Sequence, residues 1–474
     1  DITRARERLG FEELFHLLLA SQLNRQENAK LEGVSIPFDL PTVKRFVAEL
    51  PFRLTNAQRV AAWEIIQDFE KQAPMNRLLQ GDVGSGKTVV AGIAALEAAQ
   101  SGYQTAFMAP TEILARQHAE TLNLLLEPFG ITVGLLIGAM KGKARAALYE
   151  QIEKGSVAVI IGTHALIQDS VKFHNIGFVV IDEQHRFGVA QRQALLAKAP
   201  HMPHLLAMTA TPIPRSLQLT VFGELDISIL NERPANRKPI KTSIVNPVST
   251  ATVYAAIDQQ IAKGRQAYVI CSLIDDSPTS DKKSVEVEYK KLKNSVFGHR
   301  SIAMLHGRMK ADEKEQIMQD FKAKKYDILV STTVVEVGVD VPNATVIMIE
   351  NSDQFGLAQL HQLRGRVGRG EEQSFCYLMM SDSKKPSERL RELEKSNDGF
   401  YLAEVDLKLR GPGEIYGRMQ HGELNLQIAS LADTRQIKRA QAAAESFIDS
   451  KQSLLQYKQL AEAVQKYQRL TTLN

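Results

Sequence analysis

The sequence predicts an α/β protein in which two parallel-sheet domains follow each other, with helical segments at both ends of the chain. Short apolar runs alternate with helical stretches in two blocks, and a polar joint with two prolines, residues 231–239, separates the blocks. A glycine-rich turn also joins the first expected strand to a helix. Because alternating strands and helices form βαβ units, we expect each block to be a parallel sheet with helices on both faces.

The length and composition are those of an ordinary globular protein. At about 150 residues per domain, 474 residues correspond to about three domains. Apolar residues make up 44% and charged residues 24%, which excludes the disordered and fibrous classes. No apolar run approaches the ~18–20 residues that span a bilayer, so no membrane partner is expected. The net charge of +4 permits a nucleic-acid partner but does not argue for one.

Cysteine is rare in this chain. Cys271 and Cys376 form no CxxC pair and offer at most one bridge. A disulfide scaffold and a cysteine-rich zinc site are therefore not expected, and a reducing, cytoplasmic location is favoured.

Four segments are expected along the chain. Residues 1–50 hold an amphipathic helix, from Thr3 to Gln26, and a linker marked by prolines. Residues 51–233 form the first sheet domain and residues 234–382 the second. Residues 383–474 are helical and rich in charge.

Apolar runs of strand length mark the expected strands, because parallel strands buried on both faces have continuous apolar sequences. In the first block they are Arg77–Gln80, Thr105–Ala109, Val133–Ile137, Val157–Ile161, Phe178–Ile181 and Leu205–Met208. In the second block they are Gln266–Ser272, Ile302–Leu305, Asp327–Ser331, Thr345–Ile349 and Ser374–Met379.

The turn after the first strand matches the phosphate-binding pattern G-x-x-x-x-G-K-[ST] at every fixed position, between a strand and a helical stretch as that motif requires. Glycines let backbone N–H groups turn inward around phosphate oxygens, at the N-terminus of the following helix. Lys87 is expected to reach the β- and γ-phosphates, and Thr88 to bind Mg²⁺. A glycine-rich turn that binds nothing is the alternative. The nucleotide-binding residues expected here are Gly81, Gly84, Ser85, Gly86, Lys87 and Thr88.

An acidic pair ends the strand Phe178–Ile181. The carboxyl ends of parallel strands face the crevice in which ligands bind. Asp182 and Glu183 alone would suggest an ordinary solvated loop. Beside a phosphate loop, Asp182 is expected to hold Mg²⁺, and Glu183 to orient or deprotonate the attacking water.

The two motifs together resemble those of the superfamily 2 helicases and translocases, whose motor has two RecA-like domains in tandem. The resemblance makes residues 51–233 an ATP-binding lobe and residues 234–382 a second lobe. Gln58 resembles the glutamine that reads adenine in that family. Further motifs of the first lobe resemble those that grip a nucleic-acid strand or couple it to the nucleotide. These residues are Thr111, Arg116, Thr163, His185, Thr209 and Thr211.

The second block carries two more motifs of that family. The run V-E-V-G-V-D resembles motif V, which places Gly338 and Asp340 at the nucleotide. Residues 362–369 match the pattern Q-x-x-G-R-x-G-R, with Gln362 as a coupling residue. Since the second block has no phosphate loop, Arg366 and Arg369 are expected to act on the γ-phosphate held by the first block. There they would be catalytic charges that stabilise the transition state.

Two stretches resemble the bacterial RecG and Mfd motors. The acidic pair lies in D-E-Q-H-R-F-G, which is not the DEAD signature of RNA-unwinding proteins. Residues 398–415 resemble the hairpin with which those two motors move along duplex DNA, and Arg410 is among its coupling residues. The expected helix at residues 4–23 resembles one that precedes the motor of RecG, so RecG is the closer match of the two. The chain is therefore identified as a member of the RecG type, with residues 383–474 as translocation hairpin and C-terminal helices.

The resemblance implies an ATP-dependent translocase or helicase on double-stranded DNA, with ATP and Mg²⁺ as cofactors. Its task would be to remodel branched DNA, by regression of stalled forks and branch migration of Holliday junctions, in recombination and repair. Single-stranded-DNA-binding or replication proteins are further candidate partners, and no oligomer is implied. The alternatives are an Mfd-like translocase acting on a protein roadblock, an RNA helicase, and a nucleic-acid-binding protein that uses ATP as a latch. A latch would not need Glu183.

Three features depart from the RecG pattern or stay unassigned. Residues 417–422 differ from the family's Gly-Thr-Arg-Gln-Ser-Gly-like run, so Arg418 is displaced by one position and receives no role. The cluster from Lys282 to Lys293 resembles an exposed insertion of unknown function. RecG's wedge domain is not among these residues. We expect the wedge upstream of Asp1, and a homologue without one is the alternative.

Overall fold

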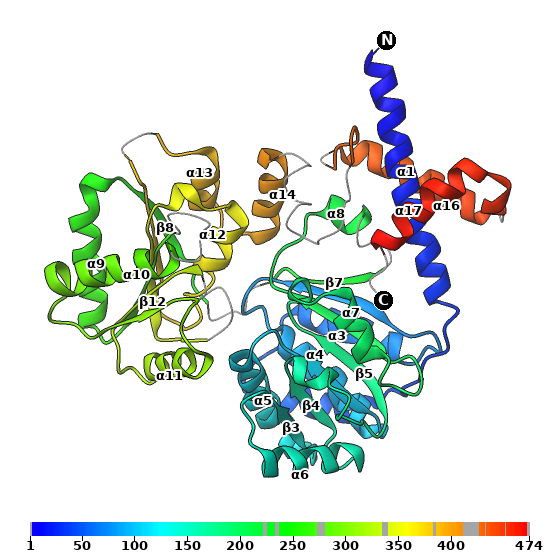
Figure 1. Cartoon of the computed structure of the whole chain (residues 1–474), viewed down its shortest axis with the longest axis horizontal. Coiled ribbons are helices and arrows are strands. Elements are labelled where there is room, and N and C mark those ends of the chain that lie inside the picture. The colour runs from blue at the N-terminus through cyan, green and yellow to red at the C-terminus, as the bar shows by residue number, and fades with distance from the viewer. Residues whose placement is uncertain are drawn as a thin grey trace. The chain divides into compact units, whose positions relative to one another are not determined.

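The computed structural model describes residues 2–220, 225–232, 237–272, 280–333, 340–382, 385–410, 426–431, 433–450 and 452–471. Its contacts divide the chain into two compact units (Figure 1). Unit 1 comprises Asp1–Gly81, Ser85–Glu232 and Leu407–Asn474, and unit 2 comprises Asp82–Gly84 and Arg233–Asp406. Each unit is built on one parallel sheet, which confirms the predicted fold class.

Unit 1 holds a seven-stranded sheet in the order β3-β4-β2-β5-β6-β1-β7, with every pair of neighbours parallel. Its inner strands β2, β5 and β6 are buried along their whole length, as expected for a sheet covered on both faces. The strands are β1 (Asn76–Gly81), β2 (Gln104–Met108), β3 (Val133–Leu136), β4 (Val159–Gly162), β5 (Ile176–Ile181), β6 (His204–Thr209) and β7 (Asp226–Leu230).

Helices pack on both sides of this sheet. They are α3 (Asn56–Phe69), α4 (Lys87–Gln100), α5 (Glu112–Leu126), α6 (Gly142–Glu153), α7 (Val189–Leu196) and α8 (Arg215–Thr220). The helix α4 is buried from Val89 to Ala98 and packs against both α3 and α5. Within the described ranges, no helix combines the length and apolar character that crossing a bilayer requires.

Unit 2 holds a six-stranded sheet in the order β10-β11-β9-β12-β13-β8, again with every pair parallel. The strands are β8 (Lys241–Val245), β9 (Gln266–Ile270), β10 (Ile302–Leu305), β11 (Ile328–Ser331), β12 (Ala344–Ile349) and β13 (Phe375–Met379). The helices that follow or join these strands are α9 (Thr250–Ala262), α10 (Ser280–Lys291), α11 (Ala311–Lys322), α12 (Leu357–Arg364), α13 (Glu388–Lys395) and α14 (Gly399–Arg410).

Two strands, β7 and β8, were not among the predicted strands, and each lies at one of the two edges of its sheet. In β7 the side chain of Ile229 is exposed, and in β8 those of Lys241 and Ser243 are exposed. Because an edge strand faces solvent on part of its surface, it lacks the continuous apolar run that reveals an inner strand.

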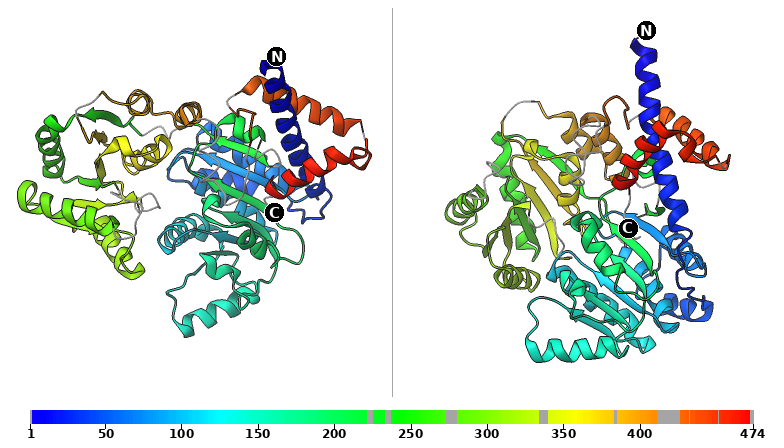
Figure 2. Two further views of the ribbon diagram at one scale, coloured as in Figure 1. Left: turned by 45° about the horizontal axis from the view of Figure 1, so that its top comes forward. Right: turned by 45° about the vertical axis from the view of Figure 1, so that its right-hand side comes forward.

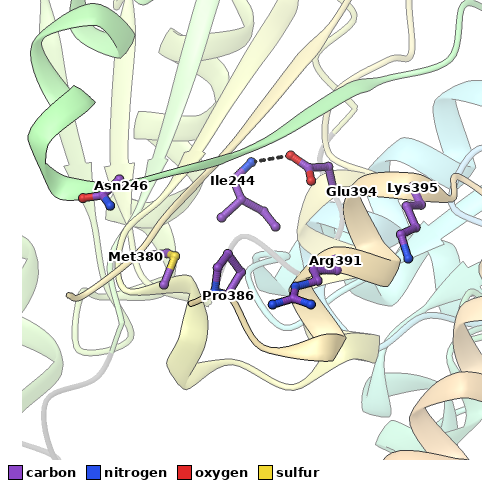
Figure 3. Close-up of a pocket in the computed structure, with 7 residues that line it drawn as sticks. All are labelled: Ile244, Asn246, Met380, Pro386, Arg391, Glu394 and Lys395. Atoms are coloured by element: carbon purple, nitrogen blue, oxygen red, sulfur yellow. Dashed lines mark hydrogen bonds between the residues drawn. The ribbon is translucent and has the colours of Figure 1, made fainter. Parts of the chain in front are cut away.

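The edge strand β8 is covered by α13. The backbone N–H of Ile244 donates to Oε1 of Glu394 at 2.9 Å (Figure 3), so the helix satisfies a backbone group that the sheet leaves unpaired. An open cavity of about 410 Å³ lies at this junction. Its lining residues are Ile244, Asn246, Met380, Pro386, Arg391, Glu394 and Lys395.

The lysine-rich segment from Lys282 to Lys293 is not simply an exposed insertion, as the sequence suggested. Val285 and Leu292 are fully buried in the core of unit 2. Lys291 pairs with Glu288 at 3.0 Å on the outer side of the same segment. Helix α10 therefore buries Val285, and the short helix Leu292–Val296 that follows it buries Leu292, although apolar residues are few among the charges.

The N-terminal helix α1 (Ile2–Asn28) lies against the two terminal helices, α16 (Thr434–Asp449) and α17 (Lys458–Thr471), as Figures 1 and 2 both show. Leu14 and Leu18 of α1, Ile437 of α16 and Val464 of α17 belong to one buried cluster. The same cluster reaches Leu78 of β1. The two ends of the sequence therefore complete the core that begins at the sheet of unit 1.

A carboxylate of α1 holds the segment before α16. The side chain of Glu13 accepts hydrogen bonds from the backbone N–H groups of Gln427, Ile428 and Ala429 at 3.1, 3.0 and 2.8 Å. Glycine at position 10 lets α16 lie close to α1, since a Cβ there would be 3.1 Å from Oε1 of Gln436. Charge-assisted bonds of this kind are stronger than neutral ones.

We predict that Glu13→Ala lowers the free energy of unfolding by about 1–3 kcal/mol, because it leaves three backbone donors without their acceptor. The matched control is Glu12→Ala. Glu12 pairs with Arg8 on the exposed side of α1, and such pairs contribute less than about 1 kcal/mol. The measurement is chemical denaturation of both variants. An equal loss of unfolding free energy in the two variants would show that the Glu13 contact stabilises the fold no more than an exposed ion pair does.

The predicted linker contains a helix, α2 (Leu40–Glu49), with Pro41 in its first turn, a position that tolerates proline. The backbone N–H of Asp39 donates to Oε2 of Glu97 on α4 at 2.8 Å. Glu97 is 1% exposed, and its Oε1 has no hydrogen-bond partner among the described residues. Burial raises the pKa of Glu97 to about 7.

This raised pKa predicts a pH-dependent stability. Between pH ~4.5 and 7 the folded chain keeps a proton on Glu97 that the unfolded chain has released, so stability falls as the pH rises through this window. We expect a loss of about 1–3 kcal/mol from this group. Unfolding free energies from pH 4.5 to 8 should show the decline in the wild type and in the control Glu120→Gln, but not in Glu97→Gln. A Glu97→Gln profile that still declines like the wild type would contradict the assignment.

Candidate functional site

The phosphate-loop sequence forms the turn between β1 and α4. Gly84 and Gly86 have φ angles of +77° and +86°, a region that favours glycine. Gly86 also has no room for a side chain, since a Cβ there would collide with Nε2 of Gln58. It is the N-cap residue of α4, so the turn leads directly into the positive end of a helix, where anions bind.

Gln58 ties the start of α3 to this loop. Its Oε1 accepts from the backbone N–H of Thr55 at 2.8 Å, and its Nε2 donates to the carbonyl of Ser85, also at 2.8 Å. The side chain therefore lies at the margin of the loop. Its role as an adenine reader stays a prediction.

Lys87 lies within the loop. The side chain is largely buried, and Nζ donates to the carbonyl oxygen of Gly81 at 2.7 Å. The hydroxyl of Ser85 is buried and has no hydrogen-bond partner in the described part of the chain. A cation and a buried hydroxyl inside a glycine turn fit a phosphate group.

The acidic pair follows β5, close to the loop. Oδ2 of Asp182 is 2.8 Å from Nε2 of His118. Burial alone would raise the pKa of Asp182, but the hydrogen bond to His118 and the charge of Lys87 hold it below its usual range. Asp182 is therefore a carboxylate. An ionised group at this depth requires such partners.

Glu183 adopts the left-handed backbone conformation, with φ at 49°. This conformation is costly for a side chain of this size and clusters at functional sites. Its Oε2 accepts from the backbone N–H of Ala210 at 3.3 Å, directly after β6. The second acidic residue therefore contacts the Thr209–Thr211 segment, which the sequence predicted to be a coupling motif.

His118 of α5 joins the two motifs, and sequence reasoning did not single it out. Its Nδ1 is 3.3 Å from Oγ1 of Thr88, while its Nε2 contacts Asp182. The ring is 6% exposed and packs on Phe107, with ring centroids 4.7 Å apart. The signal in the sequence was only a histidine that follows Arg116 by two positions.

The donors brought together here fit Mg²⁺. A hydroxyl and a carboxylate are oxygen ligands of the kind Mg²⁺ prefers, completed in such sites by waters and substrate phosphates. Thr88 and Asp182 each contact the same imidazole ring. They would hold the ion, and the ion would neutralise charge on the phosphates.

The other predicted residues of unit 1 stand at the same edge of the sheet, after the strands β2, β4 and β6. Thr111 caps α5, with Oγ1 accepting from the N–H of Leu114 at 3.3 Å. Thr163 follows β4, and its buried Oγ1 has no partner among the described residues. The hydroxyls of Thr209 and Thr211 are 2.7 Å apart. Their roles toward DNA stay predictions.

His185 follows the acidic pair in the short helix Gln184–Arg186. Its Nδ1 is 3.6 Å from Oε2 of Glu183. Burial, with a smaller contribution from the charge of Arg186, lowers the pKa of His185 to about 4. The ring is therefore neutral at pH 7.

Unit 2 presents the predicted arginines in buried surroundings. Arg366 is 5% exposed, and the side chain of Arg369 is 6% exposed. Nη1 of Arg369 pairs with Oδ1 of Asp340 at 3.2 Å, and its Nε donates to the carbonyl of Gly365 at 3.3 Å. Asp340 therefore holds the side chain of Arg369. The sequence predicted that Asp340 contacts the nucleotide, but it did not predict this ion pair.

The neighbouring Arg364 was not predicted to be functional. It is almost fully buried, and its Nη1 donates to the carbonyls of Leu393 and Ser396 at 2.7 and 2.8 Å. It thereby ties α12, which also carries Gln362, to the end of α13. Three predicted positions, Gly338, Arg418 and the side chain of Arg410, lie outside the described residues.

Three family models match the chain. Residues 55–220 match "DEAD/DEAH box helicase", residues 251–371 match "Helicase conserved C-terminal domain", and residues 396–473 match "ATP-dependent DNA helicase RecG, domain 3, C-terminal". The ATP-dependent DNA helicase RecG of Staphylococcus epidermidis is 48% identical over 98% of this chain and 69% of its own length. That of Bacillus subtilis is 47% identical over 94% of this chain and 66% of its own length.

The chain belongs to the RecG family. Its membership confirms the predicted resemblance and identifies the chain as one of the ATP-dependent DNA helicases. RecG of Thermotoga maritima is 47% identical over 91% of this chain, which covers 55% of that protein. The chain thus spans between about half and two thirds of the length of most of these relatives.

A solved structure of RecG bound to a three-way DNA junction has a TM-score of 0.79 with this chain, at 42% identity. It covers 94% of this chain, which covers 57% of that one. S. cerevisiae Dbp5 bound to RNA and ADP BeF3 has a TM-score of 0.56 at 18% identity, over 80% of this chain and 97% of that one. That likeness shows the shared fold alone.

Proposed function

We propose that this chain hydrolyses ATP with Mg²⁺ at the carboxyl edge of the unit 1 sheet and uses the energy to move along duplex DNA. Its substrates would be branched DNA, namely stalled forks and Holliday junctions. The observation that carries the proposal is the contact of His118 with both Thr88 and Asp182, which brings the phosphate loop and the acidic pair after β5 into one site. The RecG structure bound to a three-way junction supports the choice of substrate.

Each residue of the site has a role that follows from its chemistry. Lys87 exchanges the Gly81 carbonyl for phosphate oxygens, because a cation binds an anion more strongly than a neutral carbonyl. Thr88 and Asp182 would hold Mg²⁺. Glu183 orients the attacking water or accepts its proton, and its contact with Ala210 passes a change at the nucleotide to the segment after β6.

The second unit contributes charge to the transition state. Arg366 and Arg369 would stabilise the negative charge that develops as the γ-phosphate leaves. For Arg369 this requires exchange of its Asp340 partner for phosphate, an exchange of one anion for another. Binding and loss of the γ-phosphate would then close and open the two units, which is how such motors step along a strand.

DNA binding would depend mainly on contacts to the phosphate backbone, so affinity should fall with salt and show little sequence preference. The proposal includes a cytoplasmic location, where chromosomal DNA lies. If the chain acts at forks, it would meet proteins that bind single-stranded DNA or replicate DNA, and these are its proposed protein partners.

The test is the ATPase rate of this chain with no nucleic acid, single-stranded DNA, linear duplex, a four-way junction and RNA. Stimulation should be largest with the junction or duplex. Lys87→Ala should abolish ATP hydrolysis with every one of these nucleic acids and without them, because the loop loses its phosphate-binding cation. Stimulation by RNA alone would instead favour an RNA helicase. Tight ATP binding with no turnover under any condition would favour an ATP-latched binding protein.

We further predict that Arg369→Ala lowers kcat by about 100-fold or more, with a much smaller change in KM for ATP, since its charge acts in the transition state. The matched control is Arg265→Ala, which removes another guanidinium of unit 2, paired with the exposed Glu372 at 2.6 Å. Steady-state kinetics with duplex DNA measure both. An unchanged kcat in Arg369→Ala would exclude a role for this arginine in hydrolysis.

A further inference from the structure

We propose that His118 is the positioning residue for the metal ligands of this site. Its ring accepts a hydrogen bond from the hydroxyl of Thr88 and donates one from its own N–H to Asp182. The remaining lone pairs of both oxygens are thereby left for the cation. The inference rests on the proposed function, because it concerns the same Mg²⁺–nucleotide site.

The direction of the two hydrogen bonds follows from the chemistry of the three groups. A carboxylate has only acceptors, so Nε2 of His118 must donate to Oδ2 of Asp182, 2.8 Å away. In the tautomer with its hydrogen on Nε2 the other nitrogen carries the lone pair, and Nδ1 accepts from the hydroxyl of Thr88 at 3.3 Å.

The ring itself is held in place. It is 6% exposed, lies against Phe107, and belongs to α5, whose first turn is capped by Thr111. Thr88 lies in the first turn of α4, and Asp182 follows β5, so the two ligands come from separate elements. One fixed ring in contact with both sets the distance between them. Partners in the outer shell of a metal site orient its ligands in this way, and their loss typically costs 10–100-fold in metal affinity.

Three variants separate the contacts. His118→Phe keeps the packing against Phe107 but removes both hydrogen bonds. His118→Asn has an amide near the position of Nδ1 and is too short to reach Asp182. His118→Gln has an amide near the position of Nε2 and retains a donor for Asp182. The control is His201→Ala, at an exposed histidine of the same unit.

The experiment measures binding of a fluorescent ADP analogue to the full chain, in EDTA and across a titration of Mg²⁺, with Mn²⁺ binding followed by electron paramagnetic resonance. We expect His118→Phe and His118→Asn to bind the cation about 10–100-fold more weakly in the presence of the analogue. Analogue affinity in EDTA should stay within about twofold of wild type. His118→Gln should recover part of the loss, and His201→Ala should match the wild type. Thermal unfolding without metal or nucleotide confirms that each variant is folded.

Several results would overturn the inference. Wild-type Mg²⁺ titrations in both His118→Phe and His118→Asn would show that the ring does not position the ligands. An equal loss of analogue affinity with and without metal would show that His118 shapes the phosphate loop instead. If His118→Phe does not fold, His118→Asn carries the test alone. A wild-type chain that fails to bind the analogue at all would contradict the proposed function, which distinguishes that failure from failure of the His118 inference.

Discussion

The site depends on one geometric constraint: all strands of the unit 1 sheet run in the same direction, so every strand ends at the same edge. The glycine turn after β1, the acidic pair after β5 and the threonines after β2, β4 and β6 are far apart in sequence but meet there. Because the strands β2, β5 and β6 are completely buried, that edge is fixed by the core of the unit. The chemistry needs no separate scaffold.

A second constraint is electrostatic. Asp182 is an ionised carboxylate that is only 6% exposed, and it is tolerable only because His118 donates a hydrogen bond to it and Lys87 compensates its charge. Arg369 of unit 2 is buried to the same degree and is matched by Asp340. In both units the charges to which we assign a catalytic role are thus already withdrawn from water and held by a partner. A bound nucleotide would replace some of these partners and would not have to dehydrate the groups anew.

Much of this could be predicted from the sequence, and the remainder has identifiable causes. Inner strands such as β5 and the glycine turn are continuous local patterns, so apolar runs and fixed spacings reveal them. The strands β7 and β8 were not predicted because polar residues interrupt their short apolar sequences. His118, Arg364 and Glu13 escaped for another reason. Each acts through partners 29 or more residues away along the chain, and no local pattern in one sequence encodes such a contact.

The docking of α1 onto the far end of the chain has a consequence for synthesis. The bonds from Glu13 join residues 414 to 416 positions apart. At ~5–20 residues per second, a ribosome needs roughly 20–80 s to make the segment that receives this helix. Throughout that interval the leucines of α1 lack the part of their native surface that α16 and α17 provide. The nascent chain therefore leaves apolar side chains of α1 partly uncovered for most of its translation, and surface of this kind promotes aggregation until it is buried.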